Sequence, residues 1–172
     1  MKTIFGAKYD IIHEVITDYT LDDQLIWAIS INNSDNEIMV GWKSQFDILC
    51  DNKNFKSIEA DAEVYMVKQA MRICEKYKLK TVRGFALAFD IVLQNGSINS
   101  EATIAIDAAI NKTPNMTKKA LIKVIANAVA DSSDNSEDVR SRKVAIADGT
   151  GIVHGTMLDL DENYGLNDNS WR

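Results

Sequence analysis

One carboxylate, Asp90, lies in the middle of the apolar segment that runs from Arg83 to Ile98. Its apolar neighbours cover every side of a helix, which predicts that this helix is buried all round: Phe85, Leu87, Phe89, Ile91, Val92 and Leu93. A buried charge without a partner is costly, so Asp90 needs a cation. Arginine forms bidentate pairs with carboxylates, and we therefore expect Arg140 or Arg142 to pair with it.

The polar residues that follow Asp90 allow two interpretations. Gln94 lies one helical turn after Asp90 on the same face, and Asn95 comes next. In the structural interpretation, Asp90 anchors its helix through an ion pair or hydrogen bonds. In the functional interpretation, Gln94 and Asn95 line a cleft and bind the hydroxyl or acetamide groups of a glycan. The sequence leaves both open.

A basic cluster lies further along the chain, at Arg140, Arg142 and Lys143. These residues stand at offsets of 0, 2 and 3 on an expected helix, so they cannot all face one partner. We expect one arginine to point inward. Binding of an anionic substrate is the alternative role, and a solvated basic face is the ordinary one.

His154 follows between glycines in the segment GTGIVHG, where it could be exposed as a proton-transfer group. Only His13 accompanies it, and the cysteines and histidines do not have the spacing of metal ligands. The Gly-x-Ser-x-Gly motif of serine hydrolases does not occur either. The sequence therefore predicts no metal site and no cofactor.

The composition argues against several classes of protein. Hydrophobic residues make up 46% and charged residues 26% of the 172 residues, and no apolar run approaches the roughly 18 residues of a membrane span. The net charge of −6 argues against nucleic-acid binding, which needs a concentrated basic face. Asp10 and Glu14 interrupt the N-terminal segment before any long apolar core, so we expect no signal peptide and a cytoplasmic location on synthesis.

The elements that must position these residues are predicted to be helices. Apolar residues recur at spacings of three and four, and Pro114 is the single proline. We expect an all-α fold of about seven helices in one domain over residues 1–172, with an irregular tail over residues 157–172. Thr20 and the segment Ser34–Glu37 are predicted to cap helices at their start. Both cysteines, Cys50 and Cys74, are expected to be buried and reduced.

Further helix boundaries follow from the same pattern. The helices are expected over residues 9–16, 21–29, 38–49, 57–77, 83–95, 100–111, 117–131 and 136–147. Gly96 and Gly149 are predicted to end the helices that precede them, because glycine tolerates the left-handed conformation that closes a helix.

Four strings taken together resemble a lysozyme-like peptidoglycan hydrolase domain of phage lysins and bacterial cell-wall enzymes, which is distantly similar to chitosanases. The strings are DQLIWA from Asp23, WKSQF from Trp42, ALAFDIVLQNGSI from Ala86 and DVRSRKVAIADGTGIVHG from Asp138. The resemblance runs from about Phe5 to Leu166. It implies a lysozyme-like helical bundle and hydrolysis of a β-1,4 aminosugar bond.

The chain also departs from that family. Its members carry a catalytic glutamate in an earlier helix, followed by a glycine-rich loop and short strands that bind the glycan, and this chain has neither. It is therefore expected to correspond to the C-terminal lobe of such an enzyme, without the acid-bearing segment: either a truncated or split gene product, or a domain that keeps the scaffold and has lost hydrolysis. Glycoside hydrolase activity is expected only if the missing catalytic segment is supplied. No catalytic residue is assigned. The expected substrate-binding residues are Asp90, Gln94, Asn95, Arg140, Arg142 and His154.

The expected partner is a glycan such as peptidoglycan, with phage-associated delivery to the cell wall. Two alternatives belong to other classes of protein. One is a non-catalytic helical module that binds peptidoglycan or a protein partner supplying the missing lobe. The other is a structural protein of a phage or prophage.

Overall fold

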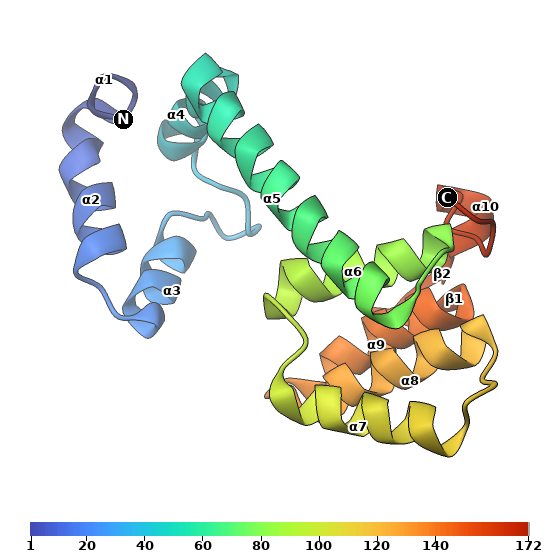
Figure 1. Ribbon diagram of the computed structural model, residues 1–172. Helices are drawn as coiled ribbons and strands as arrows, with labels where there is room; N and C mark the ends of the chain where they lie inside the picture. Colours follow the sequence, from blue (N-terminus) through green and yellow to red (C-terminus); the bar gives the residue numbers. More distant parts are fainter. Residues whose placement is uncertain (172) are drawn as a thin grey trace. The chain divides into compact units, whose positions relative to one another are not determined.

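A computed structural model describes residues 1–171 and places most of them in helices (Figure 1). The predicted all-α class is confirmed. The chain groups into two compact units, Met1–Ala62 and Glu63–Arg172, and the expectation of one domain stays a prediction. The boundary between them falls within the long helix α5, Lys53–Tyr77. No helix in the described part of the chain is long and apolar enough to cross a membrane.

The first unit consists of short helices around a small core. They are α1 (Lys2–Phe5), a 3₁₀ turn (Gly6–Lys8), α2 (Tyr9–Thr17), α3 (Leu21–Ser30) and α4 (Val40–Asp51). Its buried side chains include Phe5, Ile12, Val15 and Ile31. Two tryptophans, Trp27 of α3 and Trp42 of α4, pack edge to face with ring centroids 5.4 Å apart.

The caps of the first unit follow the prediction at one position and depart from it at another. Thr20 caps α3, because its Oγ1 accepts a hydrogen bond from the amide of Asp23 at 3.2 Å. The capping box predicted at Ser34–Glu37 is wrong. The side chain of Asn33 accepts hydrogen bonds from the amides of Asp35 and Glu37 at 3.0 and 2.9 Å, and these bonds stabilise a turn. The helix therefore begins only at Val40. Cys50 is exposed, contrary to expectation, while Cys74 is buried.

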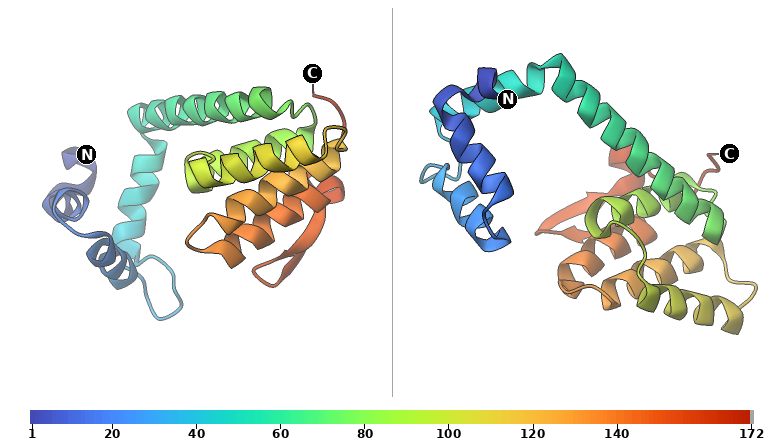
Figure 2. Two further views of the ribbon diagram at one scale, coloured as in Figure 1. Left: turned by 60° about the horizontal axis from the view of Figure 1, so that its bottom comes forward. Right: turned by 60° about the vertical axis from the view of Figure 1, so that its left-hand side comes forward.

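The second unit holds the larger core. Beyond α5 it contains α6 (Val82–Asn95), α7 (Ser100–Lys112), α8 (Lys118–Asp131), α9 (Ser136–Asp148), the strands β1 (Thr150–Val153) and β2 (Thr156–Asp159), and α10 (Leu160–Tyr164). Within it, α7, α8 and α9 pack in that order, and the β1–β2 hairpin packs on α9 (Figures 1 and 2). Gly96 and Gly149 close α6 and α9 with positive φ angles of 73° and 86°, as predicted.

The core of this unit is built on α6. Leu87 and Ile91 are fully buried and belong to one cluster with Ile106, Ile122 and Ile125 of α7 and α8. The prediction that α6 is buried all round is wrong, because Leu93 is 56% exposed. One face of α6 therefore remains at the surface, next to the polar residues that follow Asp90.

The C-terminal segment is more ordered than expected. The irregular tail predicted for residues 157–172 is wrong for residues 157–164, which complete β2 and form α10. β1 and β2 are antiparallel, with Ile152 opposite Met157, and the turn residues His154 and Gly155 both have positive φ. This turn matches the right-handed twist of the strands. The prediction missed the hairpin because glycines and a histidine interrupt a very short alternating pattern.

Candidate functional site

Asp90 of α6 is paired with two cations of α9. The Nη2 of Arg142 donates a hydrogen bond to its Oδ1 at 2.7 Å, and the Nζ of Lys143 donates to its Oδ2 at 2.8 Å. Lys143 also donates to the Oε1 of Gln94 at 3.0 Å. The predicted pairing of Asp90 with Arg142 is confirmed, and Arg140 takes no part in it. Each oxygen of a nearly buried carboxylate thus has its own donor, and α6 is tied to α9.

Lys143 is the second cation at Asp90, where an arginine alone was predicted. Its side chain is completely buried. Burial lowers the pKa of Lys143, while its hydrogen bond to Asp90 and the charge of that carboxylate act in the opposite direction. The sequence does contain a signal for it. Val139, Lys143 and Ala147 are spaced by four residues, and all three lie on the buried face of α9.

A cavity of about 340 Å³ opens beside this cluster. Asp90 and Arg142 form its polar end. The rest of its lining is apolar or aromatic and comes from α9, the hairpin, α10 and the residues just after it: Ala145, Ile146, Val153, Leu158, Leu160, Tyr164 and Leu166. The Tyr164 side chain is well exposed, at 61%, so one aromatic surface borders the cavity and remains open to solvent.

The cavity can hold a ligand that is polar at one end and apolar over the rest of its surface. Arg142 keeps a third of its side-chain surface exposed although it is bonded to Asp90. Arginine carries five N–H donors, so its free donors can still bind hydroxyl, carbonyl or carboxylate oxygens of a ligand. Asp90 is the only carboxylate among the described residues that line this cavity. The cavity therefore lacks the pair of facing carboxylates that glycoside hydrolysis requires.

The remaining residues predicted for the site lie elsewhere. The Nδ2 of Asn95 donates to the Oγ of Ser133 at 3.2 Å, and both residues border a separate polar pocket of about 230 Å³. Gln94 is bonded to Lys143 and is not part of the cavity lining. Of the predicted cleft residues, the structure therefore brings together Asp90, Gln94 and Arg142. Asp90 and Arg142 line the cavity, and Gln94 does not.

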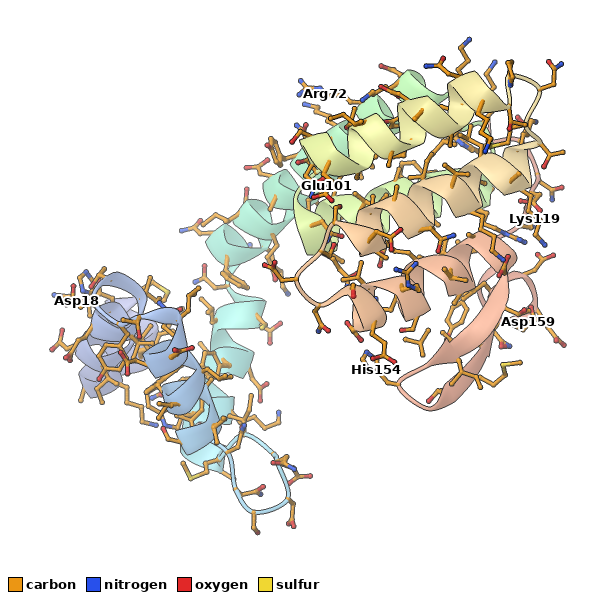
Figure 3. All side chains as sticks on the ribbon, turned by 90° about the horizontal axis from the view of Figure 1, so that it is seen from below. Asp18, Arg72, Glu101, Lys119, His154 and Asp159 are labelled. Atoms are coloured by element: carbon orange, nitrogen blue, oxygen red, sulfur yellow. The ribbon has the colours of Figure 1, made fainter. Side chains whose placement is uncertain are left out.

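Arg140 and His154 also lie outside the cavity. Arg140 donates to the Oδ1 of Asn127 at 2.9 Å, pairs with Asp131, and borders a different groove beside α8 and β1. His154 lies in the turn of the hairpin, where Figure 3 labels it, and its Nε2 is 3.4 Å from the Oδ1 of Asp138. The described residues contain no cluster of three or more histidine, cysteine or acidic side chains suited to a metal ion.

No protein-family model, curated protein or solved structure matches this chain. The resemblance to lysozyme-like hydrolases remains a prediction from the sequence.

Proposed function

We propose that the chain recognises a glycan of the peptidoglycan type, and that it does so in the cavity between α6, α9, the hairpin and α10. The observation that carries this proposal is the composition of the cavity lining: an arginine held by a carboxylate at one end, an apolar wall, and an exposed tyrosine.

These groups suit an N-acetylated sugar. The face of a sugar ring carries C–H groups that pack on an aromatic side chain, as Tyr164 would allow. The methyl group of an acetamide would be buried against Leu158 and Leu160, and its carbonyl would accept a hydrogen bond from Arg142. A volume of about 340 Å³ lies at the lower end of the range of ligand sites, roughly 300–1,000 Å³, which favours a short stretch of glycan.

Recognition is favoured over hydrolysis. Hydrolysis of a glycosidic bond needs a proton donor and a second carboxylate roughly 5 to 9.5 Å away across the bond. Within the described part of the chain, Asp90 is the only carboxylate of the cavity lining, and both of its oxygens already accept hydrogen bonds from cations. A carboxylate held in this way positions Arg142 and α9.

Binding and lysis of purified bacterial cell walls test this proposal. We expect the protein to sediment with the walls and to leave their turbidity unchanged. In solution, calorimetry with a soluble β-1,4-linked N-acetylglucosamine tetramer should detect binding to the wild-type chain. Clearing of the walls would contradict the recognition role, and absence of any binding to walls or tetramer would contradict the glycan proposal.

A pair of tyrosine variants locates the site. Tyr164→Ala removes the aromatic group of the cavity, and we expect the tetramer affinity to fall about three- to tenfold, as the loss of one aromatic contact implies. Tyr65→Ala is the matched control, because Tyr65 of α5 is equally exposed, at 62%, and lies outside the cavity. Equal effects of the two substitutions would place the glycan elsewhere.

A protein partner is the second candidate, and α3 supports it. Four large apolar side chains of this helix are not covered by the rest of the first unit: Leu21, Leu25, Ile26 and Ile29. An apolar helical surface of this kind is typical of protein–protein contacts. Under this alternative, Leu25→Ser together with Ile29→Ser would abolish partner binding and leave sedimentation with cell walls unchanged.

A further inference from the structure

Arg83, in the first turn of α6, is buried although it carries a permanent charge. It is only 7% exposed. Its Nη1 lies 3.6 Å from the Oδ2 of Asp168, which is an ion pair too long for a hydrogen bond, and its Nε has no hydrogen-bond partner within the described part of the chain. Burying a charged side chain with so few partners costs free energy. The position of Arg83 therefore points to a structural role for this side chain.

The guanidinium of Arg83 occupies space that only a glycine leaves open. A Cβ added to Gly149 would lie 2.6 Å from the Nη1 and 2.8 Å from the Cζ of Arg83. Gly149 ends α9 with a φ of 86°, and its carbonyl accepts a hydrogen bond from the amide of Leu160 at 2.8 Å. The planar group of Arg83 thus packs on the point where α9 ends and where α10 is attached.

The C-terminal strap, which we define as residues 165–171, is bound to the same end of α6. The amides of Arg83 and Val82 donate to the carbonyls of Asn167 and Asn169 at 2.9 and 3.0 Å. These bonds use the amides of the first turn of α6, which have no partner within the helix. The strap is therefore fixed along its length, and Arg83 contacts it through both its backbone and its side chain.

The outer end of the strap is also docked. Trp171 donates its amide to the carbonyl of Lys80 at 3.2 Å, and its ring packs on Phe85 with centroids 5.6 Å apart. At its other end the strap begins directly after Tyr164, and its second residue, Leu166, lines the cavity. Undocking of the strap would therefore remove one wall of the cavity.

We infer that Arg83 is a positioning residue for the cavity: it holds the C-terminal strap on the start of α6 and thereby places Tyr164 and Leu166 at the ligand. This inference rests on the proposed glycan recognition for the identity of the ligand. Ligand binding and strap docking are then linked, because a ligand that contacts Leu166 stabilises the docked strap. The docked strap raises the affinity for the ligand by the same factor by which the ligand favours docking.

Hydrogen exchange of the full-length chain measures strap docking directly. In Arg83→Met, which keeps the bulk of the side-chain stem and removes the charged plane, we expect the amides of Val82 and Trp171 to exchange at least tenfold faster than in the wild type. The tetramer affinity should fall about fivefold. Lys119→Met is the matched control: like Arg83→Met it removes one cation, but from an exposed position of α8, and it should change neither quantity (Figure 3).

Two further measurements separate positioning from general stability. In the wild type, the tetramer should slow exchange of the strap amides, and in Arg83→Met this protection should be lost while amides of α8 exchange as before. Trp171→Ala removes a strap contact outside the cavity lining and should also speed exchange of the strap amides and weaken tetramer binding. It therefore tests the inference even when Arg83→Met does not fold. Arg83→Lys, which keeps the charge but not the plane, should give intermediate values.

The outcomes distinguish the two proposals. If Arg83→Met and Trp171→Ala leave strap exchange unchanged, Arg83 does not hold the strap and the inference is wrong. Faster exchange with unchanged tetramer affinity would also overturn it, because the strap would then not position the site. If the wild type binds no tetramer, the glycan proposal and the ligand-linked part of this inference both fail, while the exchange data still decide whether Arg83 docks the strap.

Discussion

Asp90 shows how a carboxylate in an apolar helix is accommodated. It accepts hydrogen bonds from Arg142 and Lys143, and Gln94 takes a second bond from Lys143, so the polar atoms of this cluster bond to one another. Breaking such a buried pair is expensive because the partner that remains is left uncompensated. The cluster therefore fixes how α6 and α9 pack, and it orients Arg142 at the cavity.

Asp90→Asn tests this role. The substitution leaves Lys143 as a buried cation without a charge partner, and we expect the free energy of unfolding to fall by about 3 kcal/mol. Asp148→Asn is the control, because its pair with Lys123 is partly exposed and should contribute at most about 1 kcal/mol. Urea unfolding measures both. A loss of tetramer binding by Asp90→Asn without a loss of stability would assign Asp90 to ligand contact alone.

The buried ammonium of Lys143 predicts a dependence of stability on pH. Burial lowers its pKa from the ordinary value of 10.5, so between the lowered pKa and 10.5 the unfolded chain binds more protons at this position than the folded chain. Its contribution to the free energy of unfolding therefore rises with pH across that window. We expect the stability of the wild type relative to Lys143→Met to increase as the pH approaches 10.5 from below in urea titrations. A difference that stays constant would contradict the prediction.

At the scale of elements, the hairpin depends on a close contact with α9. A Cβ added to Gly151 of β1 would lie 2.7 Å from the Cβ and 3.0 Å from the Cα of Ala145. Glycine at this position lets the backbone of β1 approach the helix. The contact places Val153 and Leu158, one on each strand, against the cavity.

Gly151→Ala should displace the hairpin. We expect a loss of about 2 kcal/mol in the free energy of unfolding from overpacking, together with weaker tetramer binding, because the Val153 and Leu158 walls move. Gly155→Ala is the control: its Cβ would meet nothing within 4 Å, and its φ of 77° should cost only about 1 kcal/mol without affecting binding. Thermal unfolding and calorimetry with the tetramer compare the two variants. Equal tetramer affinities would show that the hairpin does not shape the site.

At the scale of the whole molecule, the two units have separate cores. The cluster that includes Leu87, Ile91 and Ile125 draws all of its residues from the second unit, and the cavity lining comes from that unit alone. A unit of roughly 110 residues with its own core is of a size that folds independently.

We expect a fragment of residues 63–172 to fold and to bind the tetramer with the affinity of the full chain. Its circular dichroism should show helical structure and one cooperative thermal transition. A fragment that folds but binds at least tenfold more weakly would show that the first unit contributes to recognition. A fragment without a cooperative transition would contradict the independence of the second core.

Local patterns were sufficient to predict much of the fold. Apolar periodicity predicts the all-α class, Thr20 predicts the start of α3, and Gly96 and Gly149 predict the ends of α6 and α9, because each of these features depends on residues within one or two turns. The need of Asp90 for a cation also follows from the sequence, since it depends only on the apolar residues around that carboxylate.

Other features depend on which segments meet in space. Lys143 rather than Arg140 joins Arg142 at Asp90 because the rotation of α9 against α6 decides which side chains face inward. Asn95, Arg140 and His154 resemble site residues in the sequence, yet packing places them at other pockets or at the hairpin turn. The cavity and the strap held by Arg83 arise from residues more than 50 positions apart in the chain, and only the packed chain brings them together.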